Sequence, residues 1–226
     1  MEAKKAIQTR NRILKSAIGL FLTGGYEKAT MREIAKKAEI SPGAIYYYFE
    51  SKEHVVQAFY DSTQKEHYEA CKEILDKERS LKLRLKGVIR KKIELAQPAR
   101  DISKVLFRVA SDPANPLSPF SPQSKPVRDE AIAFFRETIA GSDDKIHPDL
   151  LDLLPEYLWL YQMGIILYWI HDRSENAEKT FALIHRTSDL IVRLIKLYGS
   201  PFIAPVRRKL LSILQECRQF GVQENG

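Results

Sequence analysis

The sequence contains few of the residues that build disulfide frameworks, metal centres and phosphate-binding loops. Its two cysteines, Cys71 and Cys217, are far apart in a chain of 226 residues and resemble neither a disulfide framework nor a metal site. The five histidines are scattered, and acidic pairs such as Asp143-Asp144 lack the spacing of metal ligands or of a catalytic triad. A glycine-rich phosphate loop is also missing. We therefore predict that the protein is not an enzyme and uses no metal or other cofactor.

Long apolar runs are absent too. The opening residues, MEAKKAIQTR, lack the apolar core of a signal peptide. No run reaches the roughly 18 apolar residues that a membrane span needs. The most apolar stretch, Leu158–Ile170 (LWLYQMGIILYWI), is shorter than that, so a buried helix is the better interpretation. We expect a cytoplasmic protein in a reducing compartment, without a membrane segment.

What the chain does have is positive charge and helical periodicity. The formal net charge of +7 suits a nucleic-acid partner, although it would also suit a membrane surface. Apolar residues recur at helical spacing through most of the chain, while five of the eleven prolines fall in residues 111–126 and exclude a helix there. The expected fold is all-α, with one long loop whose role the sequence does not reveal.

Residues 30–52, TMREIAKKAEISPGAIYYYFESK, carry the most informative pattern. Thr30 is a good N-cap, and Glu33 follows it at the spacing of a capping box. Ser41 is a second candidate N-cap, and Pro42 falls at the first helical position, where its missing N–H costs nothing. This pattern predicts two short helices joined by a sharp turn.

The second of these helices must bury some residues and expose others. Ile45 and Phe49 are four residues apart and are expected to anchor it to a core, so at least two of the rings of Tyr46, Tyr47 and Tyr48 must point away. Two short helices joined by a turn of three or four residues are typical of a helix-turn-helix, whose second helix enters the DNA major groove. An ordinary helical hairpin with exposed tyrosines is the alternative.

From Ile13 to Val56 the chain resembles the DNA-binding signature of the TetR family of bacterial transcriptional regulators. The matched positions, in order, are Gly24, Gly25, Tyr26, Thr30, Ile34, Ala35, Ser41, Gly43, Tyr46, Phe49 and Lys52. Glu39 departs from the pattern because it stands at a turn position where the family often has glycine, and a positive φ there would cost about 1 kcal/mol. Tyr48 stands where a histidine is common.

The resemblance implies a set of DNA contacts. The start of the first helix would meet a phosphate, the small residues would let the second helix approach the groove, and the tyrosines would reach bases or backbone. The predicted contact residues are Thr30, Arg32, Ser41, Pro42, Gly43, Ala44, Tyr46, Tyr47, Tyr48 and Lys52. Because this second helix has no Arg, Asn or Gln, base specificity is expected to depend on Tyr47, backbone approach and DNA shape.

The length of the chain suits this small unit plus one larger helical domain. A helix is expected to open at Ser51-Lys52 and to continue through Leu75, which would place the boundary inside a rigid helix. We predict a three-helix DNA-binding domain over residues 1–55. Residues 56–226 are predicted to form a helical effector-binding and dimerisation domain.

Two helices of the second domain have more apolar surface than one neighbour can cover. Leu158–Ile170 is apolar on every side, and residues 176–198 carry two apolar seams. The first seam consists of Phe181, Ile184, Ser188, Ile191 and Ile195, and the second of Leu183, Thr187, Leu190, Leu194 and Leu197. The resemblance implies that these helices form a four-helix interface in a homodimer, which suits a palindromic operator in double-stranded DNA. The predicted interface residues are Trp169, Ile184, Ile191 and Ile195.

Aromatic density and the resemblance together predict a pocket for a small, mostly apolar effector. The predicted lining residues are Phe107, Phe134, Phe135, Trp159, Tyr161 and Met163. Effector binding would shift the recognition helices and release the DNA, so the protein is expected to be a repressor. One alternative is an effector-independent architectural or adaptor protein whose second domain only dimerises or recruits a protein partner. Another is a membrane-surface protein. The sequence does not identify the operator, the effector or the regulated genes.

Overall fold

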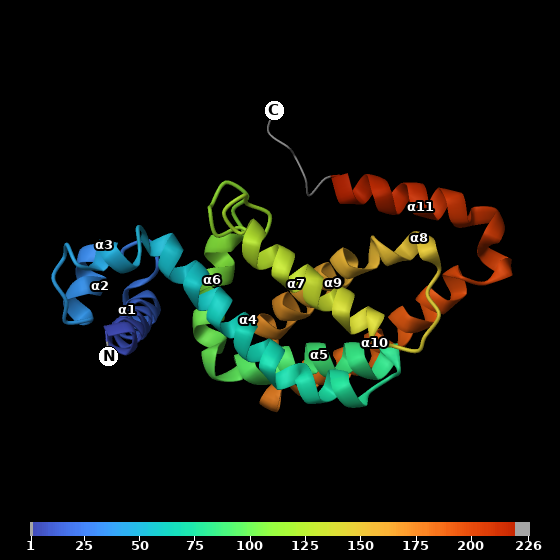
Figure 1. The fold of residues 1–226 in the computed structure, drawn as a ribbon, viewed down its shortest axis with the longest axis horizontal. Helices are drawn as coiled ribbons and strands as arrows, with labels where there is room; N and C mark the ends of the chain where they lie inside the picture. Colours follow the sequence, from blue (N-terminus) through green and yellow to red (C-terminus); the bar gives the residue numbers. More distant parts are fainter. Residues whose placement is uncertain (1, 220–226) are drawn as a thin grey trace. The chain divides into compact units, whose positions relative to one another are not determined.

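The computed structural model of the protein describes residues 2–219, and within this range the chain forms helices joined by turns, without strands (Figure 1). The α-helices are α1 (Glu2–Gly24), α2 (Met31–Lys37), α3 (Ile45–Tyr48), α4 (Lys52–Lys77), α5 (Leu81–Ala96), α6 (Arg100–Ala110), α7 (Lys125–Ala140), α8 (Pro148–Leu151), α9 (Leu154–His171), α10 (Glu178–Tyr198) and α11 (Ala204–Gln219). Short 3-10 helices are η1 (Gln97–Ala99), η2 (Glu175–Ala177) and η3 (Pro201–Ile203). The all-α prediction is confirmed. No helix of the described range is long and apolar enough to cross a membrane.

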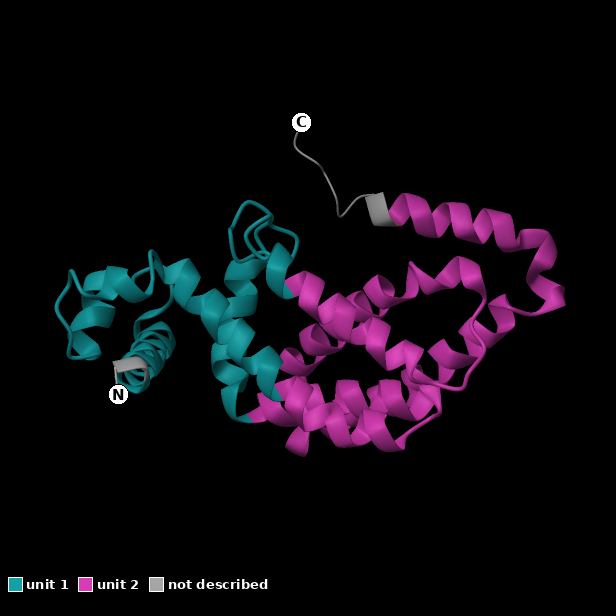
Figure 2. Cartoon of the chain, in the orientation of Figure 1, with its two compact units in different colours: residues 1–66, 98–127 teal, residues 67–97, 128–226 magenta. Residues whose placement is uncertain are grey.

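The chain divides into two compact units (Figure 2). Unit 1 contains residues 1–66 and 98–127, and unit 2 contains residues 67–97 and 128–226. The first division falls within α4, which runs without a break from Lys52 to Lys77. The expected continuous helix is therefore present. The domain boundary between residues 55 and 56 stays a prediction, because compact packing units and domains are different divisions of a chain.

In unit 1, helix α1 packs against α2 and α6. Their buried faces share a core of apolar side chains that are spaced three or four residues apart along each helix. Members of this core include Ile13, Ala17 and Phe21 of α1, Ile34 and Ala35 of α2, Ile45 of α3, Val55 and Val56 of α4, and Ile102 and Leu106 of α6. Helices α2 and α3 are too short to be stable alone, so this shared core is what holds them in place.

The proline-rich segment is a series of turns that repeats every three residues. Asp112, Asn115, Ser118 and Ser121 each precede a proline. The N–H groups of Asn115, Ser118 and Ser121 each donate to the carbonyl oxygen three residues earlier, at 3.1, 2.9 and 3.0 Å. Proline suits the second position of such turns because its φ is already near the required value of about −65°. The predicted absence of an α-helix holds for residues 111–124. It is wrong for Lys125 and Pro126, which open α7, because proline is tolerated in the first turn of a helix.

In unit 2, helix α5 packs against both α9 and α10, and α9 also contacts α10 (Figure 1). The turn from α9 to α10 is held by Asp172, whose carboxylate accepts four hydrogen bonds. One oxygen accepts from the N–H and hydroxyl of Ser174, at 2.8 and 2.7 Å. The other accepts from the N–H and hydroxyl of Thr180, at 2.9 and 2.6 Å. The N–H of Lys179 donates to the Ser174 hydroxyl at 3.0 Å, so Asp172 and Ser174 together satisfy N–H groups at the start of α10.

Helix α9 is less completely covered than its apolar sequence predicts. Leu158, Trp159 and Trp169 are buried, whereas Leu167 and Tyr168 each remain about two-fifths exposed. One side of this helix faces the interior of unit 2, and the opposite side leaves large apolar groups accessible.

Candidate nucleic-acid interface

Helix α2 starts with the capping box that the sequence predicts. The hydroxyl oxygen of Thr30 accepts from the N–H of Glu33 at 3.2 Å. The Glu33 carboxylate in turn accepts from the N–H and the hydroxyl of Thr30, both at 2.9 Å. These hydrogen bonds from Thr30 lower the pKa of the Glu33 carboxyl group. Both roles of the Thr30 hydroxyl are thus taken up locally, and a phosphate contact by this hydroxyl would require the pair to open.

The turn after α2 depends on a strained residue. The N–H of Ala38 donates to the carbonyl of Ile34 at 2.8 Å, and the N–H of Ile40 donates to the carbonyl of Ala35 at 3.1 Å. Between them, Glu39 has a φ of 54°, which is the left-handed conformation that the glycine position of the pattern implies. The chain therefore makes the tight turn without glycine and accepts the cost of a Cβ there.

Helix α3 begins later than the sequence predicts. Ser41 and Pro42 were expected to cap and open it, but the first helical residue is Ile45 and its N-cap is Ala44. The reason is that the carbonyl and the hydroxyl of Ser41 both accept from the N–H of Ala44, at 3.0 and 3.2 Å, which closes a separate turn over residues 41–44. The N–H of Phe49 then donates to the carbonyl of Ile45 at 3.0 Å, in the α-helical pattern.

The side chains of α3 divide as expected between core and solvent. Ile45 and Phe49 are buried, while Tyr46 and Tyr47 are 57% and 84% exposed. Tyr48 is partly buried against the core of unit 1, and its ring meets that of Tyr47 edge-on at a centroid distance of 5.2 Å. The two outermost rings are therefore carried on a helix whose orientation the buried residues determine.

Lys52, predicted to contact a phosphate, has a structural role in the free protein. Its ammonium group donates to the carbonyls of Tyr26 and Glu27, at 3.1 and 3.4 Å, and lies 4.2 Å from the centre of the Tyr26 ring. The Tyr26 hydroxyl donates to Glu53 at 2.5 Å. Burial, with the Glu53 hydrogen bond, raises the pKa of Tyr26. Sequence reasoning missed this cluster because Tyr26 and Glu27 are separated from Lys52 and Glu53 by more than 20 residues along the chain.

The remaining predicted DNA contacts lie at the surface. Arg32, Ser41, Pro42 and Gly43 are exposed, and Ala44 is partly exposed. The structure thus places the predicted set on α2, α3, the turns that flank them and the first residue of α4. Their individual contacts with DNA remain predictions.

Two sequence models match this chain. The model of "Bacterial regulatory proteins, tetR family" matches residues 13–59, and the model of "Tetracyclin repressor-like, C-terminal domain" matches residues 84–208, which is more than half of the chain. The chain belongs to the TetR family. It is therefore a transcriptional regulator with a DNA-binding helix-turn-helix, and it is not an enzyme.

Individual relatives match over a short part of their length. HTH-type transcriptional regulator UidR of Escherichia coli K12 is 44% identical over 54 residues, which is 24% of this chain and 28% of UidR. The A-factor receptor protein of Streptomyces griseus is 40% identical over 57 residues, which is 25% of this chain and 21% of the relative. SrpR of Pseudomonas putida is 40% identical over 62 residues, which is 27% of this chain and 29% of SrpR. The matched part is less than a third of each of these relatives.

Solved structures show the same fold over most of the chain. A protein assigned to the TetR family from Syntrophomonas wolfei superposes with a TM-score of 0.69, at 20% identity, over 82% of this chain and 95% of that one. The fatty acid degradation regulator FadR of Bacillus halodurans superposes with a TM-score of 0.64, at 16% identity, over 81% of this chain and 94% of FadR. At these identities the likeness concerns the fold alone.

The residues predicted to line an effector pocket are spread over several helices. In unit 2, Phe134 and Phe135 are buried on α7 with ring centroids 6.5 Å apart, and Trp159 is buried on α9. Tyr161 is partly buried and shares a hydrogen bond of 2.5 Å with the hydroxyl of Thr187. Met163 is partly buried on α9, and Phe107 lies partly buried on α6 in unit 1. That these side chains line an effector site remains a prediction.

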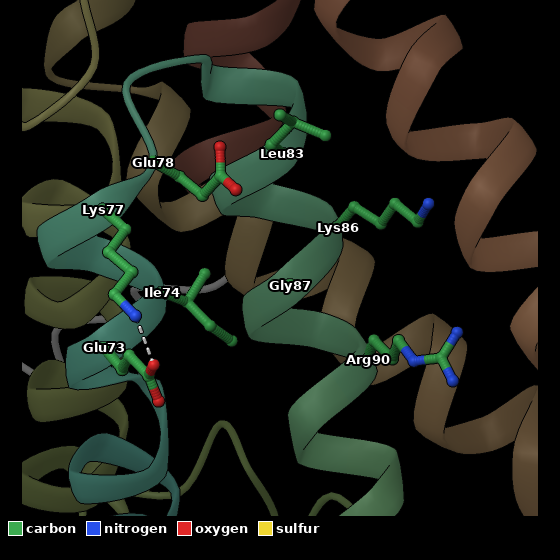
Figure 3. A pocket seen from close by; sticks show the side chains of 8 residues that line it. All are labelled: Glu73, Ile74, Lys77, Glu78, Leu83, Lys86, Gly87 and Arg90. Carbon is green, nitrogen blue, oxygen red and sulfur yellow. Dashed lines mark hydrogen bonds and ion pairs between the residues drawn. The ribbon is translucent and has the colours of Figure 1, made fainter.

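Unit 2 also has a hollow that the sequence did not predict (Figure 3). It has a volume of about 320 Å³ and lies between α4 and α5. Its lining residues are Glu73, Ile74, Lys77, Glu78, Leu83, Lys86, Gly87 and Arg90. Lys77 and Glu73 form an ion pair of 2.6 Å at its edge. Five of these eight lining residues carry charged groups, and none of the eight belongs to the predicted effector pocket.

The residues predicted for the dimer interface lie mainly in the interior of unit 2. Trp169 is fully buried and its indole N–H donates to Gln97 at 3.1 Å. Ile184 and Ile195 are buried, and Ile191 is partly exposed. These isoleucines belong to the first seam of α10. This seam is the buried one, because α10 packs against α5 and α9.

Proposed function

We propose that the protein is a dimeric transcriptional repressor that binds a palindromic operator in the cytoplasm and leaves it when a small effector binds. The observation that carries the DNA-binding part is the exposure of Tyr46 and Tyr47 on a helix anchored by Ile45 and Phe49. Anchored rings lose little conformational freedom when they meet a groove, because the core already fixes the backbone that carries them. Hydroxyl groups and ring edges then reach bases or phosphates.

Helix α10 supports the dimeric arrangement. Its second seam carries Leu190, Leu194 and Leu197, which are 54%, 53% and 46% exposed. These residues follow each other at intervals of four and three, so they form one stripe along the helix. Burial of such a stripe against a second copy stabilises the pair by roughly 25 cal/mol per Å² of apolar surface. We therefore assign the dimer contact to this second seam, together with Leu167 and Tyr168 of α9.

Helix α4 supports a link between effector binding and DNA release. It begins at Lys52, directly after the helix-turn-helix, and its C-terminal part belongs to unit 2. A displacement of α4 caused by a ligand would therefore act on the residues that follow α3 without passing through a loop.

A second candidate function is recruitment of a protein partner. It is favoured by an apolar row that begins at Phe202 of η3, which is 89% exposed, and continues through Val206, Leu210 and Ile213 of α11. Exposed apolar groups of this size in one row are typical of contact surfaces.

Selection of bound sequences from a random pool of double-stranded DNA, at a stated salt concentration, tests the proposal. We expect a palindromic sequence to be recovered, and we expect Tyr47→Ala to reduce its enrichment and to change the preferred bases. Phe202→Ala, which removes an exposed ring outside the helix-turn-helix, is the control and should recover the same palindrome. Salt-sensitive binding without any recovered motif would favour the architectural or adaptor function instead.

A further inference from the structure

His67 is a buried imidazole on the inner side of α4. It is 1% exposed, and its Nε2 lies 2.8 Å from the carbonyl oxygen of Val88 on α5. A carbonyl oxygen can only accept a hydrogen bond, so Nε2 carries the proton and donates. In the neutral ring, Nδ1 then has a lone pair and acts as an acceptor.

No donor among the described residues reaches Nδ1 of His67, although this atom is fully buried. A buried acceptor without a donor costs about 1 to 3 kcal/mol. Protonation does not relieve the cost, because burial, with the charge of Lys92, lowers the pKa of His67 to about 3. The Oε1 atom of Gln162, on the buried face of α9, is another acceptor without a described donor. The interior of unit 2 therefore has acceptors that a molecule with hydrogen-bond donors would satisfy.

The aromatic rings of Tyr68 and Phe134 lie next to the imidazole. The ring of Phe134 meets it nearly edge-on, at a centroid distance of 5.4 Å. The Tyr68 ring lies 4.3 Å from that of Phe134, and its hydroxyl donates to the carbonyl of Glu130 at 2.5 Å. The Tyr68 hydroxyl is thus committed to α7, which leaves its ring face to the aromatic group. A polar acceptor within aromatic walls is the usual composition of a small-molecule site.

We propose that Nδ1 of His67 is the hydrogen-bond acceptor of the effector site, and that the effector is a small aromatic or alicyclic molecule that carries a hydroxyl or N–H donor. This inference rests on the proposed function for its regulatory meaning, and it adds a donor group to the apolar effector that the sequence predicts. His67 is also the residue at which the two compact units divide along α4. A ligand bound there would act directly on the helix that follows the helix-turn-helix.

Nitrogen-15 NMR of the histidine-labelled full chain, at about pH 7, tests the site without a mutation. The probes are phenol, which has a hydroxyl donor, and toluene, which has a similar shape and no donor. Phenol should move the Nδ1 resonance of His67 towards that of an acceptor in a hydrogen bond, and toluene should leave it in place. A resonance already at the hydrogen-bonded position without probe would mean an internal donor such as water. That result, or a resonance that phenol does not move, would overturn the proposal.

The variant His67→Phe keeps an aromatic ring and removes the acceptor. Calorimetric titration should show phenol binding weakened roughly tenfold, with toluene binding changed by less than about twofold. His171→Phe, which alters an exposed histidine of α9, is the control and should bind phenol as the wild type does. Equal loss of both probes in His67→Phe, with an unchanged melting curve, would contradict the assigned role of Nδ1.

Operator release is measured separately, so that the two proposals fail independently. If phenol binds at His67 and the operator complex is unaffected, the site stands and effector-controlled release is wrong. If DNA selection succeeds and His67 takes no donor, the repressor function stands and this effector site is wrong.

Discussion

The guanidinium group of Arg84 occupies the space in which a side chain at Gly141 would begin. A Cβ atom built on Gly141 would overlap Nη2 of Arg84. Arg84 is 2% exposed, and it donates to the carbonyls of Glu137 and Thr138 at the end of α7, at 3.1 and 2.6 Å. The close approach is possible because glycine has no side chain.

The same arginine also reaches the end of α4. Its Nη1 donates to the carbonyl of Glu78 at 2.9 Å and to that of Leu75. One cation from α5 therefore satisfies carbonyl groups at the C-terminal ends of two helices, where the helix dipole favours positive charge. Desolvation by burial, with the nearby charge of Arg79, lowers the pKa of Arg84.

Gly141→Ala should lower the free energy of unfolding by about 1 to 3 kcal/mol, because the new methyl group displaces the buried guanidinium. Urea denaturation measures this change. Gly24→Ala is the matched control: a Cβ at this last residue of α1 meets nothing within 4 Å. We expect the control to leave the free energy of unfolding unchanged or to raise it by up to about 1 kcal/mol, because alanine has a higher helix propensity than glycine. Equal effects at the two positions would contradict the role of Arg84.

Asp172→Asn should lower the free energy of unfolding by about 2 kcal/mol at about pH 7, because the Asp172 carboxylate accepts four hydrogen bonds at the start of α10. Those bonds, from Ser174 and Thr180, outweigh the opposing effect of burial and lower the pKa of Asp172 below its ordinary 3.8. A lowered pKa stabilises the fold above the ordinary value and ceases to do so as the pH falls through the folded-state value. The difference between wild type and variant in chemical denaturation should therefore begin to shrink as the pH falls through about 3.8, and it should continue to shrink down to the lower folded-state pKa. A difference independent of pH down to acid unfolding would contradict this account.

Glu39→Gly should raise the free energy of unfolding by up to about 1 kcal/mol, because Glu39 has a φ of 54° and glycine adopts this conformation without strain. Thermal or urea unfolding measures the gain. Glu27→Gly, at an exposed turn residue outside the positive-φ set, is the control and should give no gain. A loss of stability in Glu39→Gly would mean that its side chain contributes more than its backbone strain costs.

Lys52→Ala should weaken binding to all DNA sequences alike and reduce the slope of log affinity against log salt by about 1. It should also cost about 1 kcal/mol of stability, since Lys52 donates to the carbonyl of Tyr26 in the free protein. Binding assays at several salt concentrations and a melting curve separate the two effects. Lys179→Ala, at an exposed residue of α10, is the control and should change neither the salt dependence of DNA binding nor the melting curve. An unchanged salt slope together with the stability loss would leave Lys52 a purely structural role.

Leu194→Glu should convert the dimer into a monomer, because it places a charge in the middle of the exposed stripe of α10. Sedimentation equilibrium measures the change, and operator affinity should fall with it. Leu22→Glu, at a similarly exposed leucine of α1, is the control and should leave the association unchanged. A dimer that survives Leu194→Glu would move the proposed interface to another surface.

Local patterns predicted the helix-turn-helix well, since its decisive interactions span three or four residues. The capping box of Thr30 and Glu33 and the anchors Ile45 and Phe49 follow from spacing and residue type. The positive φ of Glu39 was implied only by the resemblance to the family. The start of α3 was wrong by three residues. Serine can cap a helix or close a turn, and in this structure Ser41 closes the turn.

The sequence by itself thus determined that this protein is helical, that it carries a capped helix-turn-helix, and that α10 has two apolar seams. Only the tertiary structure decided which seam is buried, because both have the same periodicity and the packing of α5 and α9 selects between them. Tertiary structure also decided that Arg84 joins two helix ends and that His67 is buried with a free acceptor. These features depend on groups brought together from distant parts of the chain, and no local pattern specifies such contacts.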